Sequence, residues 1–381
     1  MYKKIFSGCF LVILSVVFLK SQGYLILNGQ SKRIFLADDK ENMLETAFPY
    51  GDKVKEIYGY SNRILSPNEI ISGLTATIKD PDGFLRTVNM ANPAVVEKAK
   101  NKISELNEVC HESGAEFSFI SYPSKTDSSI TPTTYGVDTN YEEVRADFLR
   151  YLESKGVDFL NVRALLENDG YTVKDIFYKT DHHWTTPAGF YAARAIGEYL
   201  NQKYDWHLNT SNLDQDKFSF TCYKNLWFGE TGRSMSRSWV RVLDDFIQIM
   251  PEYKTSISQR YSDESENTGD FSIMVDTSGY SGNVDYYSYS AHYSYSEGMR
   301  AKTTYHNNLD DGNGKKILII KDSFSVVVIP FLTLETSDVT VWDMRWDQTK
   351  NGLYQYIRDN DFDAVLVAYT DFWTDTMWNF N

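Results

Sequence analysis

The chain has 381 residues, of which 42% are hydrophobic and 24% charged, and it carries a formal net charge of −14. This composition is typical of a globular protein with one large domain or two modest ones, and it excludes collagen, a disordered acidic tail and a multi-span membrane protein. The acidic balance argues against nucleic acid as a partner, because phosphate contacts need clustered cations. Six His and three Cys exclude a Cys-rich zinc site, and we expect no metal or other cofactor.

Residues 1–27 predict export, as a signal anchor or a signal peptide. Two lysines precede an apolar run over residues 5–19, as in both kinds of segment. A helix over this run would span about 22 Å, short of the ~30 Å hydrocarbon core of a bilayer, and small residues after the run resemble a cleavage site. In both cases the lysines stay inside and the rest of the chain is extracytoplasmic, either membrane-anchored or secreted. There, Cys110 and Cys222 could form a disulfide or remain two separate buried thiols.

Residues 28–90 have mixed polarity and are predicted to form an irregular N-terminal extension, whereas helices and strands alternate after residue 90. Helices are predicted over residues 93–113, 141–155 and 187–202, and strands over 117–121 and 157–160. Thr186 is the expected N-cap of the third helix. After Gly314 the apolar runs 316–320, 339–342 and 364–368 predict strands, with helical character over 352–359. Such alternation predicts an α/β domain over 91–381, in which helices flank a central, mostly parallel sheet.

Residues 204–314 break the alternation, since they are rich in Ser, Tyr, Asp and Gly and lack a long periodic helix. We interpret them as a polar, β-rich insertion in the α/β domain. Within it, Tyr alternates with small residues over 286–295. This pattern suits a half-exposed strand, or a surface whose rings stack on sugars, and a solvent-facing segment without a ligand is the alternative.

Asp181 and His183 lie in a polar loop directly before the third predicted helix. Residues two apart in a loop can project to the same side, so the carboxylate can accept a proton from the imidazole N–H. That bond would fix the tautomer and leave the other ring nitrogen free as a base. The alternative is loop packing and helix capping. A metal site formed with His182 is less favoured, because no other His or Cys cluster supplies ligands.

Ser323 comes directly after the apolar run 316–320, on a turn that would present its Oγ at the carboxyl end of a parallel strand. A hydroxyl is a weak nucleophile that needs a neighbouring base, and the base needs a group to orient it. We therefore predict that Asp181, His183 and Ser323 meet as a triad at one edge of the sheet.

Two cations follow other predicted strands and are expected at the same edge. Lys125 comes after the strand 117–121, and Arg345 comes after the strand 339–342. Either could bind substrate or stabilise an oxyanion. For Arg345 the alternative is an ion pair with Asp343.

The run YKTDHHWTT over residues 178–186 resembles the signature of the bacterial DHHW protein family. Residues 320–324, 330–332 and 342–345 look like the C-terminal half of the same family. That family is similar to periplasmic alginate O-acetyltransferase proteins, which carry an SGNH-hydrolase-like domain. The resemblance covers roughly residues 90–381 and is weak through the insertion. It implies the same triad, and an exported enzyme beside a membrane-bound O-acyltransferase partner that supplies acyl groups from the cytoplasm.

The chain departs from the family pattern at two positions. Family members often carry Asn a few residues after the serine, and Asn in the loop after the final strand. Here Ser323 is followed by Phe-Ser-Val-Val, and the final strand leads to Tyr369-Thr370-Asp371. An amide side chain for the oxyanion hole is therefore not evident. Backbone N–H groups, Arg345 or Lys125 are the candidates to replace it.

These features predict an extracytoplasmic O-acyltransferase, with acetyl as the expected acyl group, that modifies a cell-surface polysaccharide through an acyl-serine intermediate. One alternative keeps the triad but lets water accept the acyl group, which makes the protein a carbohydrate esterase. The other is a non-catalytic surface protein that binds glycans through its Tyr-rich segment.

Overall fold

The computed structural model describes residues 51–381, apart from 73–74, 89, 126–139, 282–285, 297–299, 310–313, 347–351 and 371–373. The predicted export segment over residues 1–27 lies outside the described residues. Among the helices that are described, none is long and apolar enough to cross a membrane. The chain divides into two compact units, of which one contains the described residues up to Pro67 together with Met235–Val240, and the other contains Asn68–Ser234 and Arg241–Asn381.

The smaller unit pairs helix α4 (Gly51–Leu65) with the short helix α11 (Arg237–Val240). The carboxylate of Glu56 accepts the backbone N–H groups of Arg237 and Ser238 at 2.9 and 2.8 Å, which satisfies free donors at the start of α11. The close approach of α4 to the start of α11 needs Gly59, because a Cβ there would lie 1.5 Å from the Ser236 hydroxyl.

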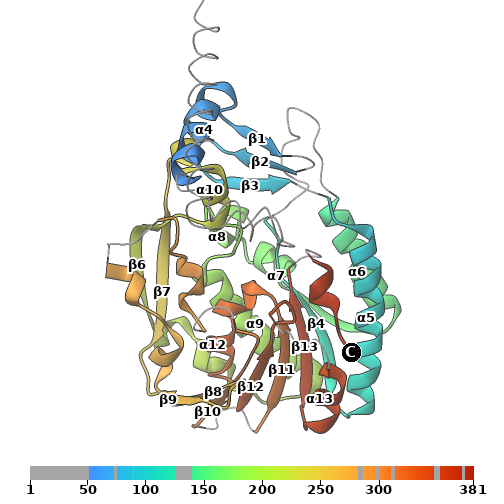
Figure 1. Cartoon of the computed structure of the whole chain (residues 1–381). Coiled ribbons are helices and arrows are strands. Elements are labelled where there is room, and N and C mark those ends of the chain that lie inside the picture. Colours follow the sequence, from blue (N-terminus) through green and yellow to red (C-terminus); the bar gives the residue numbers. More distant parts are fainter. Residues whose placement is uncertain are drawn as a thin grey trace, which may run out of the picture. The chain divides into compact units, whose positions relative to one another are not determined.

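The larger unit is built on an eight-stranded sheet in the order β5-β4-β13-β11-β12-β10-β8-β9 (Figure 1). The first five of these strands in that order pair in parallel, and the last three pair antiparallel. The strands are β4 (Glu116–Ser121), β5 (Asp158–Asn161), β8 (Ile257–Tyr261), β9 (Glu266–Gly269), β10 (Lys302–Asn307), β11 (Lys316–Lys321), β12 (Asp338–Trp342) and β13 (Ala364–Tyr369). The predicted α/β fold with a mostly parallel central sheet is confirmed.

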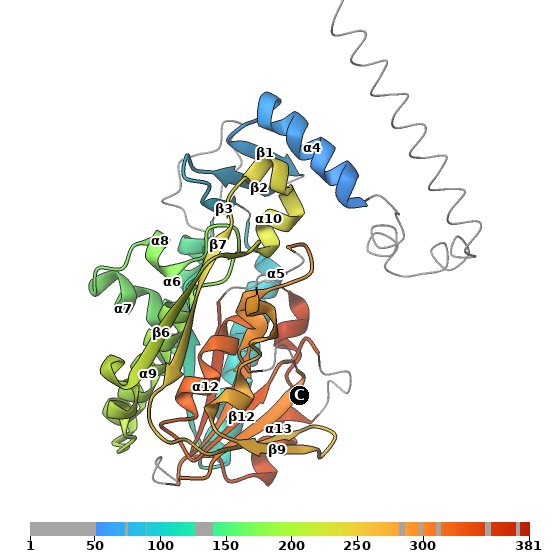
Figure 2. The same cartoon turned by 90° about the vertical axis from the view of Figure 1, so that its left-hand side faces the viewer.

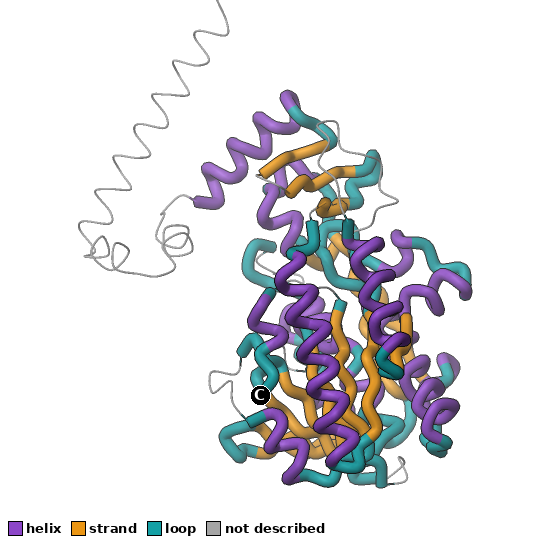
Figure 3. The backbone as a smooth tube through the Cα atoms, turned by 90° about the vertical axis from the view of Figure 1, so that its right-hand side faces the viewer, coloured by secondary structure: helices purple, strands orange, loops and turns teal. Residues whose placement is uncertain are grey.

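Helices cover both faces of this sheet, because alternate residues of the central strands point to opposite sides. Ile317 and Ile319 of β11 belong to one core cluster, whereas Leu318 and Ile320 belong to the other. The second cluster includes α5 (Pro93–Glu112), α6 (Tyr141–Ser154) and α13 (Leu353–Asp359), and Figure 3 shows this face. The first cluster includes α7 (Val162–Asn168), α8 (Val173–Ile176), α9 (Thr186–Tyr204) and α12 (Ile329–Leu332).

Residues 69–88, which the sequence predicted to be irregular, form a three-stranded antiparallel sheet of the larger unit. Its strands are β1 (Glu69–Ser72), β2 (Thr75–Lys79) and β3 (Leu85–Val88). The strands are short, so no long periodic pattern reveals them. The N–H of Leu85 donates to the carbonyl of Lys179 at 2.8 Å, which ties this sheet to the loop that carries Asp181.

The region 204–314 contains antiparallel strands, as expected, but much of it joins the main sheet. Strands β6 (Phe218–Trp227) and β7 (Asp244–Pro251) form a long two-stranded ribbon (Figure 2), whereas β8, β9 and β10 extend the eight-stranded sheet. The short helices η1 to η5 are Thr210–Leu213, Gln215–Lys217, Phe271–Met274, Ser278–Ser281 and Ala291–Ser294.

The prediction of a half-exposed strand over residues 286–295 is wrong. This segment forms turns and η5, and Tyr295 is fully buried with its hydroxyl bonded to the backbone of Ile249. Tyr289 and Tyr293 pack against the core of the larger unit. The alternation in the sequence therefore does not come from a strand.

The two cysteines that could have paired are both free. Cys110 is buried on α5 and Cys222 is exposed on β6. Burial raises the pKa of the Cys110 thiol to about 12, so this group is inert at neutral pH.

Helix α9 packs closely on η6 (Ser323–Val327) through Gly189, and this contact generates a stability prediction. A Cβ at Gly189 would lie 2.2 Å from Cγ2 of Val327. At an open helical site, Gly→Ala stabilises by about 1 kcal/mol, but overpacking a core costs about 1–3 kcal/mol. We expect Gly189→Ala to lower the free energy of unfolding in urea. The loss should shrink in a Val327→Ala background, and equal losses in both backgrounds would contradict the packing argument.

Candidate active site

The loop between α8 and α9 carries Asp181 and His183 and is closed by backbone hydrogen bonds. The N–H of Tyr178 donates to the carbonyl of His183 at 3.2 Å, and that of Thr185 donates to Ile176 at 2.7 Å. Thr185, and not the expected Thr186, is the N-cap of α9 and accepts the N–H of Ala188. The tight turn explains how two residues separated by one position come to face each other.

The structure brings Asp181, His183 and Ser323 into one hydrogen-bonded chain. Oδ1 of Asp181 lies 2.6 Å from Nδ1 of His183, and Nε2 of His183 lies 2.8 Å from Oγ of Ser323. The carboxylate also accepts the backbone N–H of His183 at 2.9 Å. Because a carboxylate only accepts, Nδ1 carries the hydrogen and the lone pair of Nε2 faces the serine hydroxyl. All three side chains are buried, with 6% of Ser323 exposed.

Ser323 lies at the carboxyl end of β11, where the strand turns into η6. Asp322, directly before it, accepts the N–H of Phe324 at 2.9 Å and that of Thr370 at 2.7 Å. Its carboxylate thereby joins the ends of β11 and β13. Burial raises the pKa of Asp322, although the charge of Arg345 and these hydrogen bonds oppose the shift. The indole of Trp184 donates to the carbonyl of Phe324 at 2.9 Å, so the two loops are fixed to each other.

The Asp181 carboxylate is held ionised inside the protein. Burial opposes its ionisation, but electrostatic interactions with the imidazoles of His183 and His182 and the hydrogen bonds from His183 and Glu230 outweigh burial and hold its pKa well below the ordinary value. The N–H of Glu230, at the start of α10 (Glu230–Met235), donates to Oδ2 at 2.6 Å. This approach requires Gly229, because a Cβ there would lie 2.5 Å from the backbone nitrogen of Asp181.

The imidazole of His183 is neutral at neutral pH. Burial, followed by the charges of His182 and His292, holds its pKa well below the ordinary value, although Asp181 opposes the shift. Its ring packs between aromatic neighbours, with centroids 3.8 Å from those of His182 and His292 and 5.2 Å from that of Phe324. A neutral imidazole with a free lone pair on Nε2 can accept a proton from a hydroxyl.

Lys125 is buried beneath the Asp181 loop. Its Nζ donates to the carbonyls of Tyr178, Lys179 and Asp181 at 2.6, 3.0 and 2.7 Å, and it lies 4.1 Å from the ring centroid of Phe84. Burial lowers the pKa of Lys125, and the carboxylates of Asp244 and Asp181 oppose this shift. An ammonium has three N–H groups, and these three carbonyls use them all. This geometry supports a role for Lys125 in fixing the loop, and not the predicted contact with a substrate oxygen.

Arg345 forms the ion pair with Asp343 that the sequence left as an alternative. Its Nε and Nη2 donate to Oδ1 and Oδ2 of Asp343 at 2.9 and 2.7 Å. The buried amine of Lys321 lies 3.5 Å from the same carboxylate. Burial opposes the charge on Asp343, but Arg345 and Lys321 lower its pKa below the ordinary value. A bidentate pair of this kind orients the guanidinium at the end of β12.

Two residues that sequence reasoning missed lie against the triad. His292 stacks on His183 and bonds the backbone of Ser323, and the Tyr293 ring lies 5.5 Å from that of His183. Burial, followed by the charges of Glu230 and Asp181, raises the pKa of Tyr293. The only sequence signal was a histidine within a run of tyrosines, which does not reveal a tertiary contact.

The ligand atoms of Asp181, His182 and His183 lie within 4.8 Å of one another, a spacing that a metal could use. Both ring nitrogens of His183, however, are already engaged by Asp181 and Ser323. A metal bound through His183 would have to break this hydrogen-bonded chain. The arrangement therefore fits proton transfer better than metal ligation.

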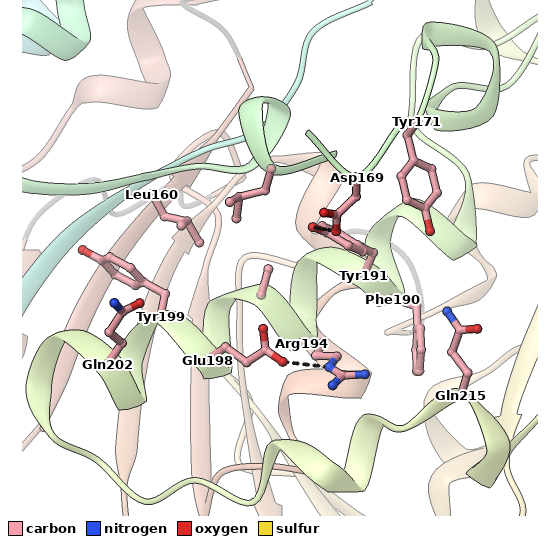
Figure 4. Close-up of a pocket in the computed structure, with 12 residues that line it drawn as sticks. Leu160, Asp169, Tyr171, Phe190, Tyr191, Arg194, Glu198, Tyr199, Gln202 and Gln215 are labelled. Carbon is pink, nitrogen blue, oxygen red and sulfur yellow. Dashed lines mark hydrogen bonds and ion pairs between the residues drawn. The ribbon is translucent and has the colours of Figure 1, made fainter. Parts of the chain in front are cut away.

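A cavity of about 590 Å³ runs along α9 and does not include the triad among its lining residues (Figure 4). Four of its polar side chains form two pairs. Tyr191 donates its hydroxyl to Asp169 at 2.6 Å, and Nε of Arg194 donates to Glu198 at 2.9 Å. The candidate chemistry therefore rests on the triad and not on this cavity.

Comparisons with known proteins agree with this fold. Residues 84–238 match the family model described as SGNH hydrolase-like domain, acetyltransferase AlgX. No curated protein matches the chain. Among solved structures, PatB1 of Bacillus cereus has a TM-score of 0.61 at 21% identity and covers 81% of this chain and 99% of its own. The structure of the same protein with a sulfonyl adduct has a TM-score of 0.62 at 19% identity, and it covers 83% of this chain and 99% of its own.

A DHHW family protein from Eubacterium siraeum DSM 15702 also has a TM-score of 0.61, at 17% identity, and covers 82% of this chain and 98% of its own. At such identities these likenesses establish the fold alone. The chain has an SGNH-hydrolase-like α/β fold, and the predicted resemblance to DHHW and AlgX-type proteins is confirmed.

The contacts of Lys125 predict that its loss loosens the Asp181 loop. Replacing it by Met leaves the carbonyls of Tyr178 and Asp181 without this donor, whereas the carbonyl of Lys179 keeps the N–H of Leu85. The cost is about 1–3 kcal/mol for each unpaired carbonyl that water cannot reach. We expect Lys125→Met to lower the unfolding free energy by about 3 kcal/mol and to speed hydrogen exchange over residues 178–185.

Lys174→Met is the matched control, because Lys174 is half-exposed and lies 5.9 Å from the same Phe84 ring. Its loss should change stability by less than about 1 kcal/mol. If Lys125→Met left loop exchange unchanged and altered only reaction kinetics, Lys125 would be a substrate-binding residue instead.

Proposed function

We propose that this chain is an O-acyltransferase that transfers acyl groups, with acetyl as the expected group, to a polysaccharide outside the cytoplasm. The observation that carries the proposal is the hydrogen-bonded chain from Asp181 through His183 to Ser323, with distances of 2.6 and 2.8 Å. The match of residues 84–238 to an acetyltransferase family model supports the same class of reaction.

In the first half-reaction the Ser323 Oγ attacks the carbonyl carbon of the acyl donor, and its proton passes to Nε2 of His183. The bond to the leaving group then breaks, and the imidazolium returns the proton to that group, which leaves an acyl-serine. In the second half-reaction His183 takes the proton of an incoming sugar hydroxyl, whose oxygen attacks the acyl carbon. Ser323 leaves and recovers the proton, so the enzyme is regenerated.

Asp181 has two tasks in this scheme. It holds the His183 ring in the tautomer that leaves Nε2 unprotonated, and it stabilises the imidazolium that forms when the ring accepts the serine proton. The pair is buried, so this attraction is screened far less than it would be in water. The three N–H groups around the carboxylate keep it ionised and therefore able to act.

For the oxyanion we propose backbone donation from the N–H of Ser323, at the start of η6. The amide side chains that family members often carry are absent here. Lys125 donates to loop carbonyls and Arg345 pairs with Asp343, which makes both weaker candidates for this task. The Tyr293 hydroxyl is a candidate second donor, because its ring lies beside the triad, with its centroid 5.5 Å from that of His183.

Export, the polysaccharide acceptor and the acyl-group partner remain part of the proposal. The apolar run over residues 5–19 behind two lysines supports delivery outside the cytoplasm. A membrane-bound O-acyltransferase that passes acyl groups across the membrane is the partner that the family resemblance implies. No finding favours the glycan-binding alternative, since the Tyr-rich segment packs into the core.

Replacing Ser323 tests the nucleophile. We expect Ser323→Ala to lower acyl transfer from an activated acetyl ester by about 10⁴-fold or more, because only the oxyanion hole and substrate binding then contribute to the rate. Mass spectrometry should find an acetyl adduct on the wild-type chain and none on the variant. Ser325→Ala is the matched control, since this buried serine bonds Tyr122 at 3.1 Å and not the triad.

An undiminished rate in a folded Ser323→Ala protein would contradict the assignment. If the wild-type chain forms the acetyl adduct but releases only free acetate, and no acetylated oligosaccharide, the protein is an esterase instead.

The lowered pKa of His183 predicts the pH profile of acylation. The base works only when neutral, and an ordinary histidine is half protonated at about pH 6.5. Because burial holds the pKa of His183 below that value, the acid limb of kcat/KM should have its midpoint below about pH 6.5. Stopped-flow acylation between pH 4 and 8, with folding checked by circular dichroism, measures it. A midpoint at or above the ordinary value would contradict a buried, neutral base.

A further inference from the structure

His292 contacts both the base and the nucleophile of the proposed triad. It lies in η5, in a segment that no sequence pattern connects with Ser323, and its side chain is fully buried. Its Nε2 lies 2.8 Å from the backbone carbonyl oxygen of Ser323. Its ring stacks on that of His183, with a centroid separation of 3.8 Å and an interplanar angle of 14°.

The hydrogen bond to a carbonyl fixes the tautomer of His292. A carbonyl oxygen only accepts, so Nε2 carries the hydrogen, and in the neutral ring Nδ1 is then unprotonated. Nδ1 is buried and has no hydrogen-bond partner among the described residues. A proton added at Nδ1 would be an unpaired donor against the His183 ring, which agrees with burial lowering the pKa of His292 to about 4.

The His183 ring is consequently held at its edges and on its faces. Asp181 and Ser323 bind its two nitrogens, and the rings of His182 and His292 both lie 3.8 Å from its centroid. The His292 ring is nearly parallel to that of His183, at 14°, whereas the His182 ring is tilted by 37°. His182 has 31% of its side chain exposed, whereas His292 is buried and bonded to the backbone of the nucleophile.

We propose that His292 is a positioning residue that holds the Ser323 peptide and the His183 ring in fixed positions relative to each other. One edge of its imidazole fixes the carbonyl of Ser323, and its face fixes the tilt of His183, so that Oγ and Nε2 stay at hydrogen-bonding distance. This inference rests on the proposed function of the triad. A displacement of about 1 Å between reacting groups can cost about 10²-fold in rate, so two contacts on one side chain have a measurable effect.

Three substitutions separate the two contacts. His292→Gln keeps a side-chain N–H that can reach the Ser323 carbonyl but removes the ring. His292→Phe keeps a ring that can stack on His183 but removes the donor, and His292→Ala removes both. His306→Ala is the matched control, because His306 is a half-exposed residue of β10 that pairs with Asp338.

The readout is the rate at which a small sulfonyl fluoride modifies Ser323, followed by intact mass and peptide mapping. In this reaction Oγ forms a bond to sulfur, the sulfur–fluorine bond breaks, fluoride leaves and His183 takes the serine proton. The probe needs no knowledge of the natural acyl donor. kcat and KM for an activated acetyl ester are measured in parallel, with thermal unfolding to confirm that each variant is folded.

We expect His292→Gln and His292→Phe to react about 10-fold more slowly each, and His292→Ala about 10²-fold more slowly. kcat should fall while KM stays within about twofold, because His292 acts on the reacting groups and not on ester binding. His306→Ala should react at the wild-type rate. If His292→Ala is unstable, the near-isosteric Gln and Phe variants still decide the matter.

The outcomes separate the inference from the function on which it rests. If wild-type Ser323 reacts no faster than other serines of the chain, the proposed triad itself fails. If wild-type Ser323 reacts and the folded Gln and Phe variants match it, His292 has no positioning role and the inference is overturned. A rise in KM at constant kcat would also overturn it.

Discussion

The site depends on one constraint, the burial of a carboxylate. Asp181 is removed from water, and an ionised group in such a place is costly unless hydrogen bonds and charge compensate it. Two backbone N–H groups and the imidazole N–H surround the carboxylate. Gly229 is required for one of these contacts, and Lys125 fixes the carbonyls of the same loop. These contacts around the loop compensate the buried charge of Asp181.

The sheet supplies the other half of the geometry. Parallel strands end at one edge, and Ser323 follows β11 there while Asp322 bonds to the backbone after β13. The nucleophile is thus attached to the most buried strands of the molecule, whereas the base lies on a loop before α9. The indole of Trp184 connects the two by its bond to Phe324. This connection keeps His183, on the loop, within hydrogen-bonding distance of Ser323, at the end of β11.

Much of this could be predicted from the sequence, because the signals were local. Apolar runs over 316–320 and 364–368 indicated buried parallel strands, and Asp181 and His183 share one turn whose geometry follows from their spacing. The serine after a strand was expected at the same edge. The tertiary partners were not predictable, since no local pattern places His292 on His183 or Lys125 beneath the loop. The rings of residues 286–295 likewise alternate in sequence but pack according to the three-dimensional core.

The cluster of imidazoles has a further consequence for the proposed reaction. Rings with centroids 3.8 Å apart cannot readily share two positive charges in a buried site. When His183 accepts the serine proton, His292 must therefore be neutral, and its burial provides this by lowering its pKa to about 4. Asp181 then compensates the one charge that forms. A neutral His292 and an ionised carboxylate together allow the buried His183 to gain a proton transiently, although burial alone would oppose it.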